Sequence, residues 1–122
     1  MSGWIGVDLD GTLARYSGWQ GELHIGEPVP AMLQRVRRWL SEGRHVKIFT
    51  ARVWEGAKNL DGTLRDVTPV RQAIEAWCEQ HLGEKLEVTC VKDYGMIALY
   101  DDRAYHVVPN TGQIFAPGDD MK

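Results

Sequence analysis

Short apolar, β-prone runs alternate along this chain with segments whose apolar residues recur at helical spacing, and this alternation constrains the fold more than any other feature. The predicted strands are residues 3–9, 45–50, 86–91 and 96–100. Strands that alternate with helices form right-handed βαβ units around a mostly parallel sheet. The sequence therefore predicts an α/β, Rossmann-like fold of three layers, with both faces of the sheet covered, as one domain over residues 1–122.

Two helices are predicted between these strands. The first begins at Pro30 and stops at Gly43, and the second has Thr68 as its N-cap, Pro69 at its first position and Gly83 behind its end. The remaining predicted features are a flap rich in Gly and polar residues at 15–29 and a C-terminal β-hairpin at 105–108 and 113–115.

The composition is that of an ordinary globular chain, with 43% hydrophobic and 25% charged residues. The net charge of −3 gives no strong electrostatic reason to expect non-specific binding to nucleic acid. No apolar run approaches the roughly 18–20 residues of a membrane span, and the first residues do not form a secretory signal. We therefore expect a cytoplasmic protein without a membrane partner.

Polar residues follow the predicted strands where each strand ends. Such ends share one rim of a parallel sheet, which is where these sheets bind ligands. The residues expected to converge there are Asp8, Asp10, Thr50, Arg52, Lys92, Asp101 and Asp102.

Up to four carboxylates at one rim would repel each other unless a cation lay between them, and oxygen ligands favour Mg²⁺. Lys92 would neutralise the charge of a phosphate, and Thr50 would donate its hydroxyl to that group. Each residue also has a structural interpretation: an Asx-type turn for Asp10, a cap for Thr50, a surface lysine for Lys92 and a solvated turn for the Asp101-Asp102 pair. The segment Asp61-Gly62-Thr63-Leu64 repeats Asp10-Gly11-Thr12-Leu13 without a preceding apolar strand, so we expect it to be structural.

Four ordered motifs make the chain similar to the haloacid-dehalogenase-like hydrolase superfamily over about residues 3–108. These are Val7-Asp8-Leu9-Asp10-Gly11-Thr12-Leu13, Ile48-Phe49-Thr50, Lys92 and Ile97-Ala98-Leu99-Tyr100-Asp101-Asp102. The resemblance implies that Asp8 is a nucleophile that forms an aspartyl-phosphate and that Asp10 is the general acid and base. It also implies that Thr50 and Lys92 orient the phosphate.

For the metal, the resemblance implies Mg²⁺ held by Asp8, the Asp10 carbonyl and either Asp101 or Asp102. Which member of that pair contacts the ion directly stays open, with a slight preference for Asp101.

Phe49-Thr50-Ala51-Arg52 and Tyr100-Asp101-Asp102-Arg103 are similar to motifs in the phosphatase domain of polynucleotide kinase/phosphatase. That similarity implies a phosphate contact for Arg52, whose alternative is a salt bridge to a rim carboxylate; Arg103 is expected to be structural. The 15–29 and 53–66 segments are too short to fold as a cap domain. Three aromatic residues are expected near the rim, to stack on a ligand or to cover the edge of the core: Trp19, Trp54 and Tyr94.

The leading functional prediction is a capless, magnesium-dependent phosphomonoesterase acting on a phosphorylated substrate such as a nucleic-acid end. One alternative is a phosphatase for small nucleotides or sugar phosphates, closed by its own loops or by a partner subunit. The other is a non-catalytic module that binds magnesium or phosphate. The tryptophan content also leaves room for a homodimer.

Overall fold

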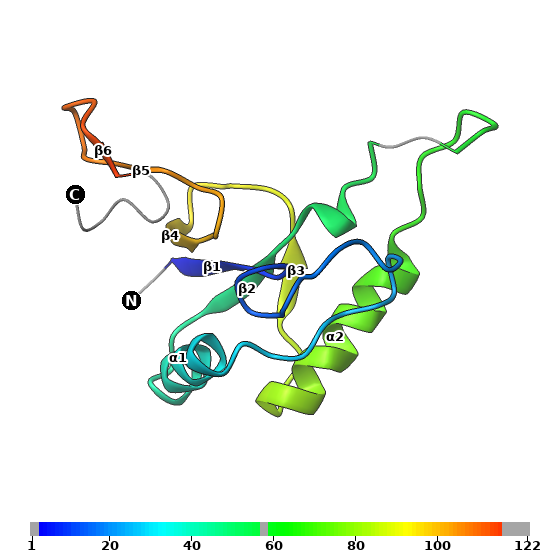
Figure 1. The fold of residues 1–122 in the computed structure, drawn as a ribbon, viewed down its shortest axis with the longest axis horizontal. Coiled ribbons are helices and arrows are strands. Elements are labelled where there is room, and N and C mark those ends of the chain that lie inside the picture. Colours follow the sequence, from blue (N-terminus) through cyan, green and yellow to red (C-terminus); the bar gives the residue numbers. More distant parts are fainter. Residues whose placement is uncertain (1–2, 57–58, 116–122) are drawn as a thin grey trace.

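A computed structural model of the chain describes residues 3–56 and 59–115 (Figure 1). The two ends of the predicted domain and part of the predicted 53–66 loop lie outside these described residues. In chain order the elements are β1 (Trp4–Asp8), α1 (Pro30–Ser41), β2 (Val46–Phe49), a 3₁₀ turn η1 (Ala51–Val53), α2 (Thr68–Leu82), β3 (Glu87–Thr89), β4 (Met96–Tyr100), β5 (His106–Val107) and β6 (Ile114–Phe115).

The main sheet has four parallel strands in the order β3-β2-β1-β4. Val7 pairs with Ile48 on one side and with Tyr100 on the other, so the ends of β1, β2 and β4 lie at one level. The structure thus confirms the predicted mixed α/β architecture with a parallel sheet, and the layout is compatible with a Rossmann-like fold.

Both helices begin close to the predicted prolines and end near the predicted glycines. Pro30 is the first residue of α1, and Gly83 caps α2 in the left-handed conformation, with a φ of 85°. Thr68 differs from its prediction as an N-cap, because it is the first helical residue of α2 and Val67 holds the N-cap position. The Asp66 carboxylate accepts the Thr68 N–H instead, at 3.0 Å.

The helices cover one face of the sheet, not two, so the predicted third layer is wrong for the described residues (Figure 1). Side chains from α1, α2 and one face of the strands join a single buried cluster. The physical reason lies in the β3–β4 connection, where residues 90–95 are too few to form a helix on the other face.

The face without helices is covered locally around Trp4, which is buried outside the main cluster. Its indole N–H donates to Asp93 Oδ1 at 2.8 Å, and the Lys47 ammonium lies 4.5 Å from the ring centroid. The β3–β4 connection is thereby fixed to the start of β1.

Two segments lie outside the helix and sheet layers. The predicted flap at 15–29 is tied to α2, because Trp77 Nε1 donates to the Gly26 carbonyl at 3.0 Å. The β5–β6 hairpin is antiparallel, as predicted, and projects away from the sheet (Figure 1). Over the described ranges, neither helix combines the length and apolarity that crossing a bilayer requires.

Candidate cation site at the strand ends

The loop that follows β1 positions the first carboxylate of the candidate site. Asp8 is the last residue of β1, and the chain turns sharply through Gly11, whose φ is +87°. A Cβ on Gly11 would lie 2.5 Å from Asp102 Oδ2, so a side chain at this position would collide with the neighbouring acidic residue. Glycine is therefore required both for the backbone conformation and for the close approach of Asp102.

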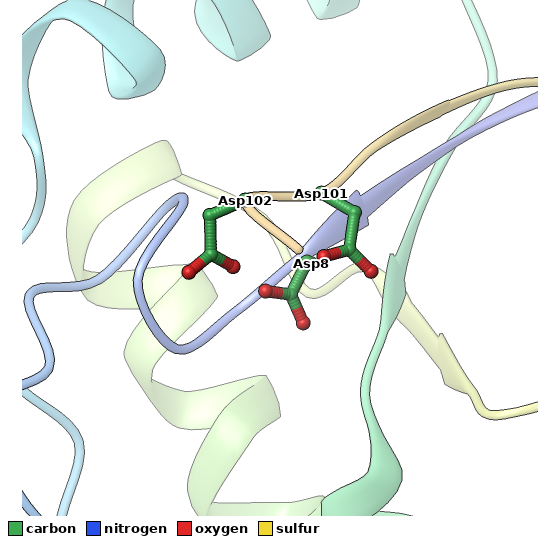
Figure 2. A group of neighbouring side chains, drawn as sticks. All are labelled: Asp8, Asp101 and Asp102. Atoms are coloured by element: carbon green, nitrogen blue, oxygen red, sulfur yellow. The ribbon is translucent and has the colours of Figure 1, made fainter. Parts of the chain in front are cut away.

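Three carboxylates meet at this point: those of Asp8, Asp101 and Asp102 (Figure 2). One oxygen of each lies within 4.8 Å of the others. They converge because β1 and β4 are parallel neighbours, so the residues after the two strands share one rim. The predicted convergence of Asp8 with the 101–102 pair is thus present in the structure.

Thr12 joins the two acidic loops. Its Oγ1 lies 3.3 Å from Asp8 Oδ2 and 3.2 Å from Asp102 Oδ1, and it accepts the Asp102 N–H at 3.1 Å. This bridging role of Thr12 was not predicted from the sequence. The position of Thr12 in a turn, two residues after Asp10, could have indicated this role, since Ser and Thr hydroxyls commonly bond to nearby backbone groups in turns.

The electrostatics of the cluster centre on Asp8, whose pKa rises from 3.8 to about 8. Burial is the largest cause, followed by a hydrogen bond with Asp102 and by the negative charges of Asp101 and Asp102; the Thr12 hydroxyl acts in the opposite direction. Like charges at close range favour a shared proton or a cation between them. A positive ion at this point would offset the repulsion between the carboxylates, which is one of the causes of the raised pKa.

The donor set fits a magnesium ion. All three side chains offer hard oxygen ligands, and Mg²⁺ takes oxygen ligands at about 2.0–2.1 Å with one or two carboxylates and several waters. The half-buried Asp8 and the more exposed Asp102 leave room for such waters.

The carboxylate of Asp10 does not join this cluster. It accepts two hydrogen bonds from Arg52, from Nε to Oδ2 and from Nη2 to Oδ1, both of 2.8 Å. The alternative interpretation of Arg52, a salt bridge at the rim, is therefore the arrangement in the structure. The third guanidinium nitrogen donates to the Glu22 carbonyl at 2.8 Å.

Of the predicted phosphate-binding pair, Thr50 lies at the rim and is among the residues that line the hollow beside the acidic cluster. Thr50 is buried at the rim, and its Oγ1 accepts the Arg52 N–H at 3.2 Å, as a cap of η1. Lys92 is exposed and is not among the residues that line the rim hollow.

A hollow of about 510 Å³ opens beside the cluster. Charged and aromatic side chains from five segments line it: Asp8, Asp10, Tyr16, Trp19, Glu22, Phe49, Arg52, Arg65, Asp101, Asp102 and Arg103. The flap forms one wall, because Glu22 pairs with Arg65 at 2.6 Å and the Trp19 ring lies 5.0 Å from the Arg52 guanidinium carbon. Of the three aromatic residues predicted near the rim, only Trp19 lines this hollow; Trp54 and Tyr94 do not.

The contact between Glu22 and Arg65 could not be predicted from the sequence, because the two residues lie 43 positions apart in segments without a strand or helix pattern. The repeated segment at 61–64 is an exposed turn, in which Asp61 Oδ1 accepts from Thr63 at 2.7 Å. It lines no part of the hollow, in agreement with its structural interpretation.

Comparison with known proteins gives two relatives with the same name. The chain is 31% identical over 86 residues to translation initiation factor 2 subunit alpha from Thermoplasma volcanium, which covers 68% of this chain and 34% of that protein. It is 25% identical over 108 residues to the subunit of the same name from Methanopyrus kandleri, covering 85% of this chain and 40% of that protein. The chain thus spans between about a third and two-fifths of the length of these relatives. No family model matches it.

Among solved structures, a conserved protein from Bacteroides thetaiotaomicron aligns with a TM-score of 0.55 and 18% identity, over 90% of this chain and 84% of that one. This likeness supports the α/β fold alone.

The two relatives contradict the predicted enzymatic function. Their name is that of a translation factor subunit and not of a phosphatase, so the phosphomonoesterase prediction, its aspartyl-phosphate intermediate and the hydrolase classification are corrected. The same two relatives also contradict the alternative prediction of a phosphatase for small nucleotides or sugar phosphates. The prediction failed because motifs shared across a fold indicate a reaction class only by analogy.

Proposed function

We propose that this chain has a role in translation, as a binding module in which a divalent cation at the rim contacts a phosphate of RNA. The observation that carries the proposal is the pair of relatives named translation initiation factor 2 subunit alpha, which align with up to 85% of the chain. A role in translation would place the protein in the cytoplasm.

The acidic cluster supplies the physical basis for the cation. Asp8, Asp101 and Asp102 bring three carboxylate groups within reach of one ion, with the Asp10 main-chain carbonyl as a proposed fourth ligand. Without a cation this rim would repel a phosphate. A bound Mg²⁺ supplies two positive charges and open coordination positions that a phosphate oxygen can fill.

The hollow beside the cluster supports a nucleotide-sized contact. Its volume of about 510 Å³ lies within the usual range of roughly 300–1,000 Å³ for small-ligand sites. Tyr16 and Trp19 are exposed on its flap side, and aromatic faces of this kind stack on unpaired RNA bases. Arg103 adds a guanidinium at the edge of the same hollow.

For the fold family, we propose a haloacid-dehalogenase-like domain without a cap. The order of the parallel strands, the acidic ends of β1 and β4 and the shortness of the 15–29 segment support this proposal. This proposal concerns the fold of the domain and does not include hydrolase activity.

The test is binding of a fluorescent single-stranded RNA to the 122-residue chain, with magnesium and with EDTA. We expect binding that requires the divalent ion and is weakened at least about tenfold by Asp101→Asn together with Asp102→Asn. Asp61→Asn is the matched control, since it lies in the repeated Asp-Gly-Thr turn outside the hollow.

Equal RNA binding in magnesium and in EDTA would overturn the cation-mediated contact. A parallel test of the translation role is sedimentation of the tagged chain in cell extract. Co-migration with ribosomal particles is expected, and complete absence from them would contradict that role.

A further inference from the structure

The Trp19 indole lies on the flap and lines the rim hollow, with one of its faces already covered. The guanidinium carbon of Arg52 lies over that face, 5.0 Å from the centroid of the ring, in the geometry of a cation–π contact. Trp19 is nevertheless 60% exposed. A flat ring that is covered on one face and still exposed to this degree presents its other face to the solvent.

Arg52 is held by bonds that leave it little freedom for another role. Its Nε and Nη2 donate to the Asp10 carboxylate and its Nη1 donates to the Glu22 carbonyl, each at 2.8 Å. The side chain is only 6% exposed. Because all three nitrogens bond within the chain, the face of the guanidinium remains for a contact, and that face supports the Trp19 ring.

The flap is fixed three residues beyond Trp19, at Glu22. The Glu22 carboxylate accepts from Arg65 Nη1 at 2.6 Å, and its carbonyl accepts from Arg52. Arg65 Nη2 also donates to the main-chain carbonyls of Arg52 and Trp54. Trp19 is therefore positioned before a ligand arrives, and a preformed contact surface spends little binding free energy on ordering.

The hollow brings the open face of Trp19 and the acidic cluster into one site of about 510 Å³. A nucleotide offers groups that match both parts, since it has a flat base at one end and a phosphate at the other. Stacking on a side chain requires a base with an uncovered face. Unpaired bases can be turned out of a strand to meet this requirement, whereas bases inside a duplex are stacked on their neighbours.

We propose that Trp19 makes this site selective for single-stranded RNA. An unpaired base stacks on the open face of the indole, while the adjoining phosphate contacts the cation proposed at the acidic cluster. Arg52 is a positioning residue, which acts on the base only through the Trp19 ring. This inference rests on the function proposed above and adds to it the class of RNA and the residue that selects it.

The experiment is fluorescence anisotropy of the 122-residue chain in magnesium with three labelled probes. These are a single-stranded RNA, the same strand annealed to its complement, and a strand of abasic ribose phosphates of the same length. The wild type should bind the single strand most tightly. Trp19→Ala should weaken that binding at least about fivefold, as expected for the loss of one stacked base, and leave the abasic strand unaffected.

Two further variants serve as controls. Trp19→Phe retains an aromatic face and should retain most of the affinity for the single strand. Trp54→Ala is the matched control and should bind all three probes like the wild type, because Trp54 is similarly exposed, at 55%, and does not line the hollow. Intrinsic tryptophan fluorescence should change when the single strand binds to the wild type, and this change should be smaller in Trp19→Phe.

The outcomes separate this inference from the proposed function. Magnesium-dependent RNA binding that is as tight in Trp19→Ala as in Trp54→Ala would overturn the role of Trp19 and leave the cation-mediated contact in place. Wild-type binding that is equally tight for the single strand and the duplex would also overturn the inference alone. The absence of magnesium-dependent binding to all three probes would overturn the proposed function, and this inference with it.

Discussion

Arg52 donates two parallel hydrogen bonds to Asp10, each of 2.8 Å, and thereby separates Asp10 from the other rim carboxylates. The pair links the loop after β1 to the turn after β2, and the Arg52 side chain is only 6% exposed. A third bond, to the Glu22 carbonyl, extends the link to the flap. Asp10 is therefore an anchor of the rim, while Asp8, Asp101 and Asp102 form the proposed cation site.

Asp10→Ala should lower the free energy of unfolding by about 2 kcal/mol, because it leaves a buried guanidinium without its carboxylate. Chemical denaturation followed by circular dichroism measures the change. Lys92→Ala is the control; Lys92 is exposed and has no hydrogen bond or ion pair within the described residues, so its effect should stay within about 0.5 kcal/mol. Equal stabilities for the two variants would show that the ion pair does not stabilise the rim.

Gly11→Ala should weaken magnesium binding at least about tenfold, because the new Cβ displaces the Asp102 carboxylate. Gly62→Ala is a matched control, since Gly62 has a similar positive φ, of +85°, in the same Asp-Gly-Thr-Leu sequence with no atom within 4 Å of the new Cβ. Both variants should lose about 1–2 kcal/mol of stability from the left-handed backbone. Isothermal titration calorimetry that gave both variants the wild-type affinity would contradict the close approach of Asp102.

Magnesium binding should strengthen as pH rises, because the ion must displace the proton that Asp8 holds up to its pKa of about 8. The apparent affinity should increase by up to about tenfold per pH unit below that value and then level off. Titrations at about pH 6 and about pH 8.5 measure the difference. The same affinity at both would mean that Asp8 is not a ligand.

Stability without metal should change with pH in the opposite direction. The folded-state pKa of Asp8 lies above its ordinary 3.8, so the folded chain holds a proton that the unfolded chain has lost between about pH 4 and pH 8. This contribution is complete below about pH 4 and is lost as pH rises toward 8. In EDTA, the melting temperature of the wild type should fall as pH rises across that window. It should fall less in Asp8→Asn, because the asparagine does not titrate. The same change of melting temperature with pH in both proteins would be evidence against the raised pKa of Asp8.

Much of the fold could be predicted because local signals and the global arrangement agree. Pro30 and Pro69 mark the helix starts, Gly83 marks an end, and the apolar runs mark each strand of the sheet. The meeting of Asp8 with the 101–102 pair also follows from sequence, since it requires only that two parallel strands be neighbours.

The errors have a common origin in contacts that no local pattern records. The missing helix layer depends on how directly the chain crosses from β3 to β4. The pairing of Arg52 with Asp10 depends on a choice between a carboxylate and an outside phosphate, which the sequence left open. The functional prediction depended on motif similarity, which indicates a reaction class only by analogy.

Anomalous diffraction from crystals soaked in manganese chloride tests the cation site most directly, because Mn²⁺ prefers the same oxygen ligands as Mg²⁺. We expect one strong peak bonded to oxygens of Asp8, Asp101 and Asp102 at about 2.0–2.2 Å. A density map with no peak between these carboxylates, or with manganese bound only elsewhere, would contradict it.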